Sequence, residues 1–352
     1  MSGFISGTSG RLTATRLAYA VLISMTVAVV FAMLVPHFGV GFDRGGRHLE
    51  LLGIDAYTPG TEAHKIFWIR MPRVLAAMLV GGALAGAGCA LQALLRNPLA
   101  EPFTLGISSG SSLAAVIAIR IGVEAKFGGA GVGVSALLGA IATLMIVSRL
   151  AQVGRQLPPA TLILAGVTMS MFCSAASVLI QYTSDFSEVS RMLRWMMGGL
   201  DSMELSTVGY ATIPILLGLV VLTMFSRSLN ALAAGPEVAA SLGVSVARTQ
   251  AIVFMVSSLL VGAAIAVAGP IGFVGLIVPH ALRSVLGPDH RVLIPASVFG
   301  GAVLLMICDT LARTVTAPAQ LPTGAVTAVL GGPFFVMILI RQKRRAAMWG
   351  RP

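Results

Sequence analysis

Long stretches without charged side chains restrict the fold of this chain more than any other feature. The clearest stretch, Leu17–Pro36, contains no charged residue. A helix of about 20 apolar residues can cross the hydrocarbon core of a bilayer, because it satisfies its own backbone hydrogen bonds. Of the 352 residues, 56% are hydrophobic and 11% are charged, whereas soluble domains carry about 25% charged residues. The chain is therefore predicted to be an integral membrane protein.

Ten apolar runs are candidates for membrane crossings, and the last ones are short and punctuated by Gly and Pro. They predict an all-α integral membrane protein with about ten transmembrane helices in a single transmembrane permease domain, residues 1–352. The runs are Leu17–Pro36, Arg73–Leu95, Leu105–Ile121, Gly128–Leu150, Leu162–Tyr182, Thr207–Phe225, Gln250–Ala268, Val274–Leu286, Val292–Ala312 and Gly324–Ile340.

The first run follows Arg11 and Arg16, as the core of a signal peptide would. It is too long for such a core, and no small-x-small cleavage site closes it. We therefore expect a retained anchor.

The distribution of charge predicts the orientation. With ten crossings and a cytoplasmic N-terminus, the cytoplasmic side receives fourteen of the 24 Lys and Arg residues but only three of the 13 acids. That asymmetry is what the positive-inside rule requires. Both termini are thus predicted to be cytoplasmic, and the basic tail Arg341–Arg345 is interpreted as an anchor on the inner face of the membrane.

The net charge of +11 does not indicate a nucleic-acid partner, because the basic residues are scattered and form no basic face with interleaved aromatic residues. The three cysteines, Cys89, Cys173 and Cys308, all lie in apolar runs. We interpret them as packing residues rather than disulfide partners or metal ligands.

No motif in the sequence supplies energy or hydrolytic chemistry. The three lysines, Lys65, Lys126 and Lys343, do not lie in the GxxxxGK[ST] context of a phosphate-binding loop. An HExxH motif is also missing. An enzyme is therefore not expected, nor is any bound cofactor or catalytic residue, and transport would need a partner ATPase or an ion gradient.

Ionisable groups within the predicted spans are costly and hence informative. Asp309 lies four residues before Arg313, so an ion pair between them, or a comparable buried pairing, explains the acid. His280 follows Pro279, and we expect it to satisfy backbone groups freed at an interrupted helix. Two such residues give little support to a proton pathway.

A polar interval at about 226–248 is predicted to lie in the cytoplasm. Pro236 suits the first turn of a short helix, with Glu237 near the positive end of its dipole. Ala239 and Ala240 keep that helix slim, and Gly243 can end it in a left-handed conformation. Such a helix can dock in a groove of a partner, although an ordinary connecting loop is the simpler interpretation.

Several motifs, in order from about residue 65 to 340, resemble those of FecCD-type permeases, the type II ABC importers for iron–siderophore, haem and cobalamin. The segment Glu237–Ala240 with Gly243 also resembles the coupling segment of importer permeases, with Val where Ala is usual. The motif segments are Arg70–Arg73, Gln92–Pro102, Leu105–Gly110, Leu164–Val167, Trp195–Gly199, Ala268–His280, Asp289–Arg291, Leu321–Gly324 and Gly331–Phe334.

The resemblance implies a bacterial inner-membrane complex of two permease copies, or close paralogues, with two cytoplasmic ATPases and a periplasmic binding protein. It also implies that Arg70, Arg73 and Arg313 dock acidic residues of the binding protein, a contact for which guanidinium groups are well suited. Asn97 and Leu99 would help to gate the inner mouth of the pathway. Pro236, Glu237, Ala239, Ala240 and Gly243 would contact the ATPase.

Two other functions stay open at this point: an ion-coupled secondary transporter acting without an ATPase, and a membrane receptor or scaffold. The chelate is also open. Met169, Met171 and Phe172 in the fifth predicted helix suit a bulky apolar ligand, but they suit helix packing equally well.

A last feature is a run of glycines in the second predicted helix. Gly82 and Gly86 form a small-xxx-small pair. We expect one face of this helix to pack tightly against a neighbour.

Overall fold

The computed structural model describes residues 14–43, 46–154, 156–201 and 203–349. Arg11, Arg155 and Arg351, which the orientation argument assigned to the cytoplasm, lie outside these residues. Short 3-10 helices cover Val35–His37, Ile54–Tyr57 and Pro102–Leu105. The other elements are α1 (Ala14–Leu34), β1 (Phe38–Asp43), β2 (Gly46–Leu51), α2 (Glu62–Leu94), α3 (Ile107–Arg120), α4 (Val123–Ala151), α5 (Pro159–Tyr182), α6 (Phe186–Met196), α7 (Leu205–Met224), α8 (Ser226–Ala234), α9 (Pro236–Ser241), α10 (Val246–Ala268), α11 (Val274–Leu286), α12 (His290–Thr314) and α13 (Thr323–Trp349).

Every predicted apolar run coincides with a helix. Within the described part of the chain, seven helices are long and apolar enough to cross a membrane, and α3, α11 and the apolar part of α13 are shorter. The helical prediction is thus confirmed. The long α4 contains a non-helical residue at Gly128, where the predicted run began.

The segment between α1 and α2 differs most from the expectation. β1 and β2 form an antiparallel hairpin in which Phe38 pairs with Leu51, and the sequence analysis did not predict it. Helix α2 also starts at Glu62, well before the predicted start at Arg73. The Thr61 side chain caps it by accepting a hydrogen bond from the His64 amide.

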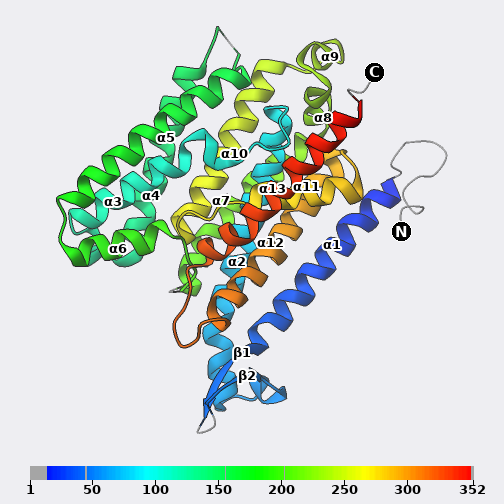
Figure 1. The fold of residues 1–352 in the computed structure, drawn as a ribbon. Helices are drawn as coiled ribbons and strands as arrows, with labels where there is room; N and C mark the ends of the chain where they lie inside the picture. Colours follow the sequence, from blue (N-terminus) through cyan, green and yellow to red (C-terminus); the bar gives the residue numbers. More distant parts are fainter. Residues whose placement is uncertain (1–13, 44–45, 155, 202, 350–352) are drawn as a thin grey trace.

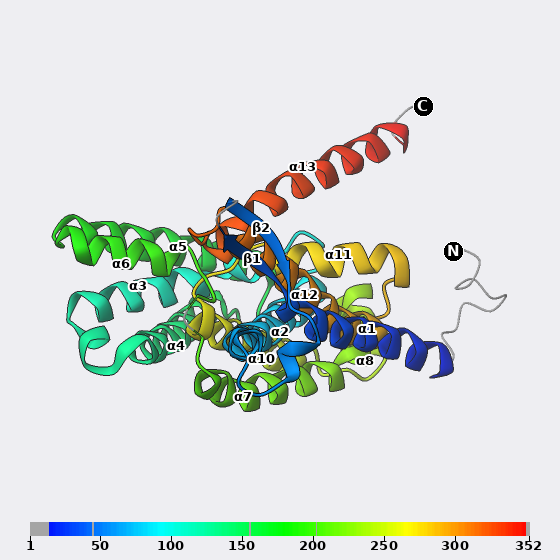
Figure 2. The same cartoon turned by 90° about the horizontal axis from the view of Figure 1, so that it is seen from below.

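Helix α2 forms the centre of the molecule. Of its most apolar window, 83% is buried, compared with 11% for α1. Viewed from below, α2 is seen almost end-on and is flanked by α7, α10 and α12 (Figure 2). Helices α3, α4, α5 and α6 form a group on one side (Figure 1).

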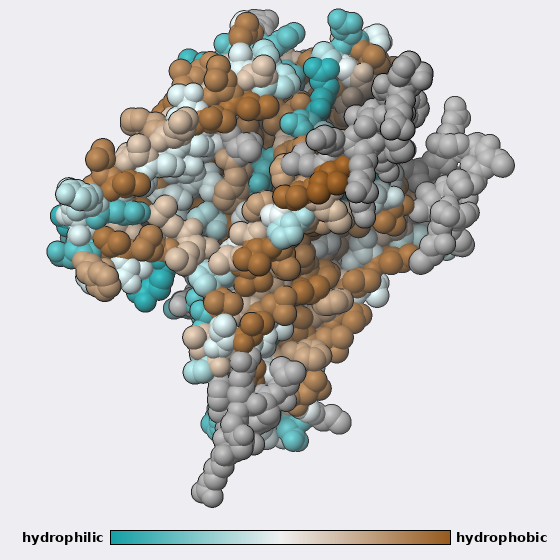
Figure 3. Space-filling model, in the orientation of Figure 1, coloured by the Kyte–Doolittle hydropathy of each residue, from teal (hydrophilic) through white to brown (hydrophobic). Residues whose placement is uncertain are grey.

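The two ends of the bundle carry different structures. The β1–β2 hairpin lies at one end, and α8 and α9 lie at the opposite end (Figure 1). On the face shown in Figure 3, hydrophobic residues spread over the middle of the molecule and hydrophilic residues gather toward its extremities. This pattern suits a protein that spans a bilayer with the hairpin on one side and α8–α9 on the other.

Glycines let α2 approach its neighbours closely, as expected. A Cβ atom added at Gly81 would lie 2.3 Å from the carbonyl oxygen of Gly301 on α12, and one added at Gly301 would lie 2.2 Å from the oxygen of Gly81. A Cβ at Gly86 would meet Leu219 of α7 at 2.7 Å, and one at Gly88 would meet the Gly275 oxygen of α11 at 2.1 Å. Cβ atoms added at the predicted pair, Gly82 and Gly86, would each lie 3.1 Å from Val298 of α12, so the expected close approach to a neighbour is confirmed.

Candidate functional site

A pocket of about 360 Å³ opens at the hairpin end of the bundle. It brings together the three arginines that the sequence analysis selected, although they come from two helices far apart in the chain. Its lining residues are Gly39, Val40, Ile69, Arg70, Arg73, Asp201, Met203, Arg313, Ala317, Pro318 and Gln320.

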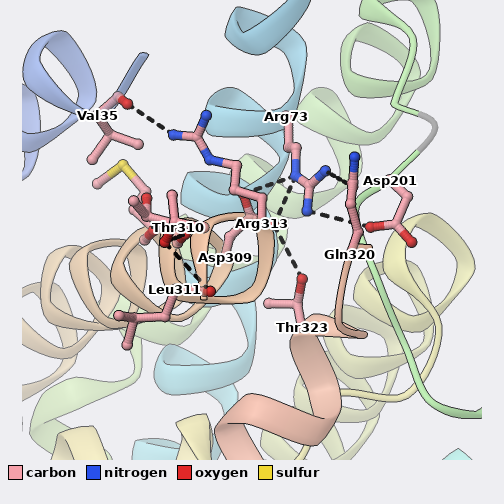
Figure 4. Close-up of polar contacts among 11 residues, drawn as sticks. Val35, Arg73, Asp201, Asp309, Thr310, Leu311, Arg313, Gln320 and Thr323 are labelled. Atoms are coloured by element: carbon pink, nitrogen blue, oxygen red, sulfur yellow. Dashed lines mark hydrogen bonds and ion pairs between the residues drawn. The ribbon is translucent and has the colours of Figure 1, made fainter. Parts of the chain in front are cut away.

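Arg73 is held by a buried network at the bottom of this pocket. Its Nε lies 2.8 Å from each carboxylate oxygen of Asp309, and its Nη1 donates to Gln320 Oε1 at 2.7 Å. Nη2 lies 3.3 Å from Asp201 Oδ1. The hydroxyl of Thr323 donates to Asp309 Oδ1 at 3.0 Å. Figure 4 shows these contacts joining α2, α12 and α13 to the segment that precedes α7.

The buried pairing expected for Asp309 is confirmed, but its partner is not the arginine that the local spacing favoured. Asp309 is buried and paired, but it binds Arg73 of α2 rather than Arg313 of its own helix. Arg313 instead turns toward α1, where its Nη2 donates to the Val35 carbonyl at 2.9 Å. The guanidinium of Arg73 reaches both carboxylate oxygens of Asp309 across the helix interface, and a buried carboxylate needs such a charge-assisted hydrogen bond.

Arg70 also binds the chain that enters the hairpin. Its Nη1 donates to the carbonyls of Pro36 and Phe38 at 3.0 and 3.2 Å. Arg70 and Arg313 are only partly buried, whereas Arg73 is 9% exposed. The pocket thus holds two partly buried arginines whose guanidinium groups bond to backbone carbonyls. The third, Arg73, pairs with the buried Asp309 and the half-exposed Asp201.

The predicted coupling segment lies at the opposite end of the molecule. Helix α9 starts at Pro236, carries Glu237 in its first turn, and is followed by Gly243 with a φ of 80°. The amides of Gly243 and Val244 donate to the carbonyls of Ala240 and Ala239, each at 2.9 Å, which is the Schellman pattern of a helix end. The short helix is therefore confirmed.

Helix α9 also presents an uneven surface. Ala239 is fully buried, while Val238 and Leu242 are 45% and 68% exposed. Val238 and Leu242, together with the exposed Glu237, form a small protruding surface at this end of the molecule, here called the knob.

Asn97 and Leu99 lie in the turn after α2. The Leu99 amide donates to Asn97 Oδ1 at 3.0 Å, so Asn97 shapes the turn through its side chain. The carboxylate of Glu101, in the same loop, accepts a hydrogen bond from the Phe273 amide at the start of α11, and Phe273 has a left-handed φ of 68°. The loop is therefore attached to α11.

The expectation for His280 was wrong. Helix α11 continues through Pro279, and His280 Nδ1 has no hydrogen-bond partner among the described residues. The ring packs edge-on against Phe334, with centroids 6.3 Å apart. The cysteine expectation is confirmed, because all three thiols are buried and unbridged.

The sequence analysis missed the polar partners Asp201, Gln320 and Thr323. Gln320 precedes the Leu321–Gly324 motif, Thr323 lies within it, and Asp201 follows the Trp195–Gly199 motif. Proximity to these motifs was the only signal that could have indicated them.

Comparison with known proteins identifies the family. The family model described as the FecCD transport family matches residues 25–341. The chain belongs to the FecCD transport family. With its seven long apolar helices in the described residues, it is a multi-pass protein of the inner membrane.

Two curated relatives illustrate the FecCD similarity. The hemin transport system permease protein HmuU of Yersinia pestis is 41% identical over 279 residues, which cover 79% of this chain and 83% of the relative. The vitamin B12 import system permease protein BtuC of Salmonella typhi is 38% identical over 281 residues, with coverage of 79% and 84%.

Two solved structures have a similar fold. A metal-chelate type ABC transporter in an inward-facing conformation matches with a TM-score of 0.78 and 30% identity, covering 92% of this chain and 99% of that one. PsaBC from Streptococcus pneumoniae shares the fold, with a TM-score of 0.53 and 15% identity over 81% of this chain and 93% of that one.

The network at Arg73 predicts an unequal response to loss of its two acids. The Asp309 side chain is 3% exposed and that of Asp201 is 51% exposed. Replacing Asp309 with Asn should destabilise the protein by about 3–5 kcal/mol, because it leaves a buried guanidinium without its counter-charge. Asp201→Asn is the matched control and should cost about 0–1 kcal/mol. Unfolding of the purified permease in mixed micelles measures both, and equal effects would contradict this network.

Proposed function

We propose that this chain is the membrane-spanning permease subunit of an ATP-binding-cassette importer that moves a metal chelate from the periplasm to the cytoplasm. The chelate is a ferric siderophore, haem or cobalamin. Two copies of the permease, or this chain and a close paralogue, would assemble with two cytoplasmic ATPase subunits. A periplasmic binding protein would deliver the chelate.

The arginine-lined pocket is the observation that carries this proposal. Three guanidinium groups and two carboxylates meet at one end of the bundle, so an excess of positive charge faces an incoming partner. Acidic side chains of a binding protein would fit it, through bidentate contacts that fix orientation. The similarity to hemin and vitamin B12 permeases agrees with this assignment.

The knob at α9 supports an ATPase partner on the other side. Pro236, Glu237, Ala240 and Gly243 are exposed there, and Ala239 anchors the helix. A short rigid helix with Val238 and Leu242 on its surface suits a groove on a moving subunit. Asn97 and Leu99, in the turn that Glu101 ties to α11, are assigned to the inner gate.

The proposed topology has ten crossings and two cytoplasmic termini. Seven long helices and three shorter ones cover the ten predicted runs in the described residues. The short α3 and α11 start at the loops joined by Glu101 and Phe273, where irregular backbone is covered by protein. The placement of the hairpin and α9 at opposite ends is consistent with this topology.

An ion-coupled secondary transporter is the alternative, and the contacts of Asp309 argue against it. Its carboxylate is fixed by Arg73 and Thr323 at 2.8 and 3.0 Å. A proton carrier must exchange its proton with water during transport, whereas the Asp309 side chain is 3% exposed and bound on both oxygens by Arg73.

The first prediction of the proposal concerns the energy source. In proteoliposomes with its ATPase and binding protein, uptake of hemin, cyanocobalamin or a ferric siderophore should require ATP inside and survive an uncoupler. One of the three chelates should be taken up much faster than the others. Uptake that stops with the uncoupler while ATP is present would favour the secondary transporter.

The second prediction concerns docking. Arg70→Glu and Arg313→Glu should each weaken binding of the binding protein, because an interfacial charge contact can contribute about 2–5 kcal/mol when it is desolvated. Arg149→Glu is the control, because Arg149 is exposed in the last turn of α4 and does not line the pocket. Arg73→Glu should also lose stability, because Arg73 is bound to Asp309.

Dissociation constants of the purified complex, measured at two salt concentrations, test docking. Raising the salt should weaken the native contact and have less effect in the Arg70 and Arg313 variants. Native affinity in both variants, with folding intact, would leave these arginines as anchors of the hairpin segment only.

A further inference from the structure

Asn230, on α8, bridges the coupling end of the molecule to α12. Its Nδ2 donates to Asp289 Oδ1 at 2.8 Å, and its Oδ1 accepts from the His290 amide, also at 2.8 Å. His290 Nδ1 lies 2.7 Å from the same oxygen. Because a backbone amide can only donate, the atom facing it is the oxygen of Asn230, so His290 Nδ1 carries a proton. One side chain thus makes three contacts with the start of α12.

Asp289, which accepts the hydrogen bond from Asn230, is held in place by further contacts. Asp289 caps α12 by accepting from the Arg291 amide at 3.0 Å, and Arg291 Nε lies 3.1 and 3.0 Å from its two carboxylate oxygens. Burial raises the pKa of Asp289, but hydrogen bonds from Arg291 and Asn230 outweigh it and lower the pKa to about 2. The carboxylate therefore stays ionised, and the Asn230 contact is a charge-assisted hydrogen bond.

Asn230 lies on α8, directly before the proposed coupling helix α9. Only Gly235, with a φ of 131°, separates α8 from the proposed coupling helix α9. At its other end, α12 carries Asp309 and Arg313 of the outer pocket, roughly 35 Å away along a continuous helix. Asn230 therefore joins the segment that would contact the ATPase to the helix that reaches the docking pocket.

We propose that Asn230 is a positioning residue that transmits movement of α8 and α9 to α12, so that ATP hydrolysis is coupled to opening of the pathway. This inference rests on the proposed function of the chain as an importer permease. Loss of the Asn230 contacts should leave α9 able to bind its partner but unable to pull α12 with it.

The test uses the complete importer in proteoliposomes and measures chelate imported per ATP hydrolysed. Asn230→Ala should lower this ratio by about tenfold, while the ATPase still co-purifies and its basal hydrolysis is unchanged. Gln152→Ala is the control: this exposed amide bonds within its own turn, and its loss should leave the ratio at the wild-type value.

A charge exchange separates transmission from simple stability. Asn230→Asp alone sets two carboxylates against each other and should uncouple the importer. Combining it with Asp289→Asn removes the repulsion and restores one amide-to-carboxylate hydrogen bond between the two positions, with donor and acceptor exchanged. Because Asp289 Oδ1 also accepts from the Arg291 amide, the exchange weakens the cap of α12, and the double variant should recover part of the ratio lost in Asn230→Asp.

Three results are decisive. A wild-type ratio of chelate to ATP in Asn230→Ala would overturn the inference. So would a double variant that melts at the wild-type temperature but has a ratio no higher than that of Asn230→Asp. Absence of ATP-driven uptake in the wild-type importer would instead refute the proposed function on which the inference rests.

Discussion

The ion pair between Arg73 and Asp309 is the interaction on which the hairpin end of this structure depends. Both side chains are almost fully buried, and the guanidinium also reaches Gln320 and Asp201. An unpaired charge at this depth would be very costly, so α2, α12 and the start of α13 are held in one arrangement. The arginine-lined pocket takes its shape from that arrangement.

The contact between α2 and α12 extends this constraint through the molecule. The facing glycines Gly81 and Gly301 let the two backbones touch, and any larger residue would separate them. At the end opposite the hairpin, Asn230 attaches α8 to the start of α12. Helix α12 is thus fixed by polar contacts at both ends and by close packing between them, which suits an element that carries movement across a membrane.

The sequence predicted the helices well because an apolar run is a local property. It placed α9 correctly for the same reason, since Pro236 and Gly243 determine the ends of that helix by their own backbone preferences. It failed where partners are distant: local spacing favoured Arg313 for Asp309, but the acid binds Arg73, 236 residues away. The hairpin and Asn230 were missed because strand pairing and a bridging amide leave no comparable periodic signal.

The coupling free energy between Arg73 and Asp309 tests the central claim most directly. Arg73→Met, Asp309→Leu and the double variant would be unfolded in mixed micelles. If the two residues neutralise each other, each single variant loses about 3–5 kcal/mol, and the double variant loses much less than the sum. If the losses add within about 0.5 kcal/mol, the two charges act independently, and this ion pair does not hold the hairpin end of the protein together.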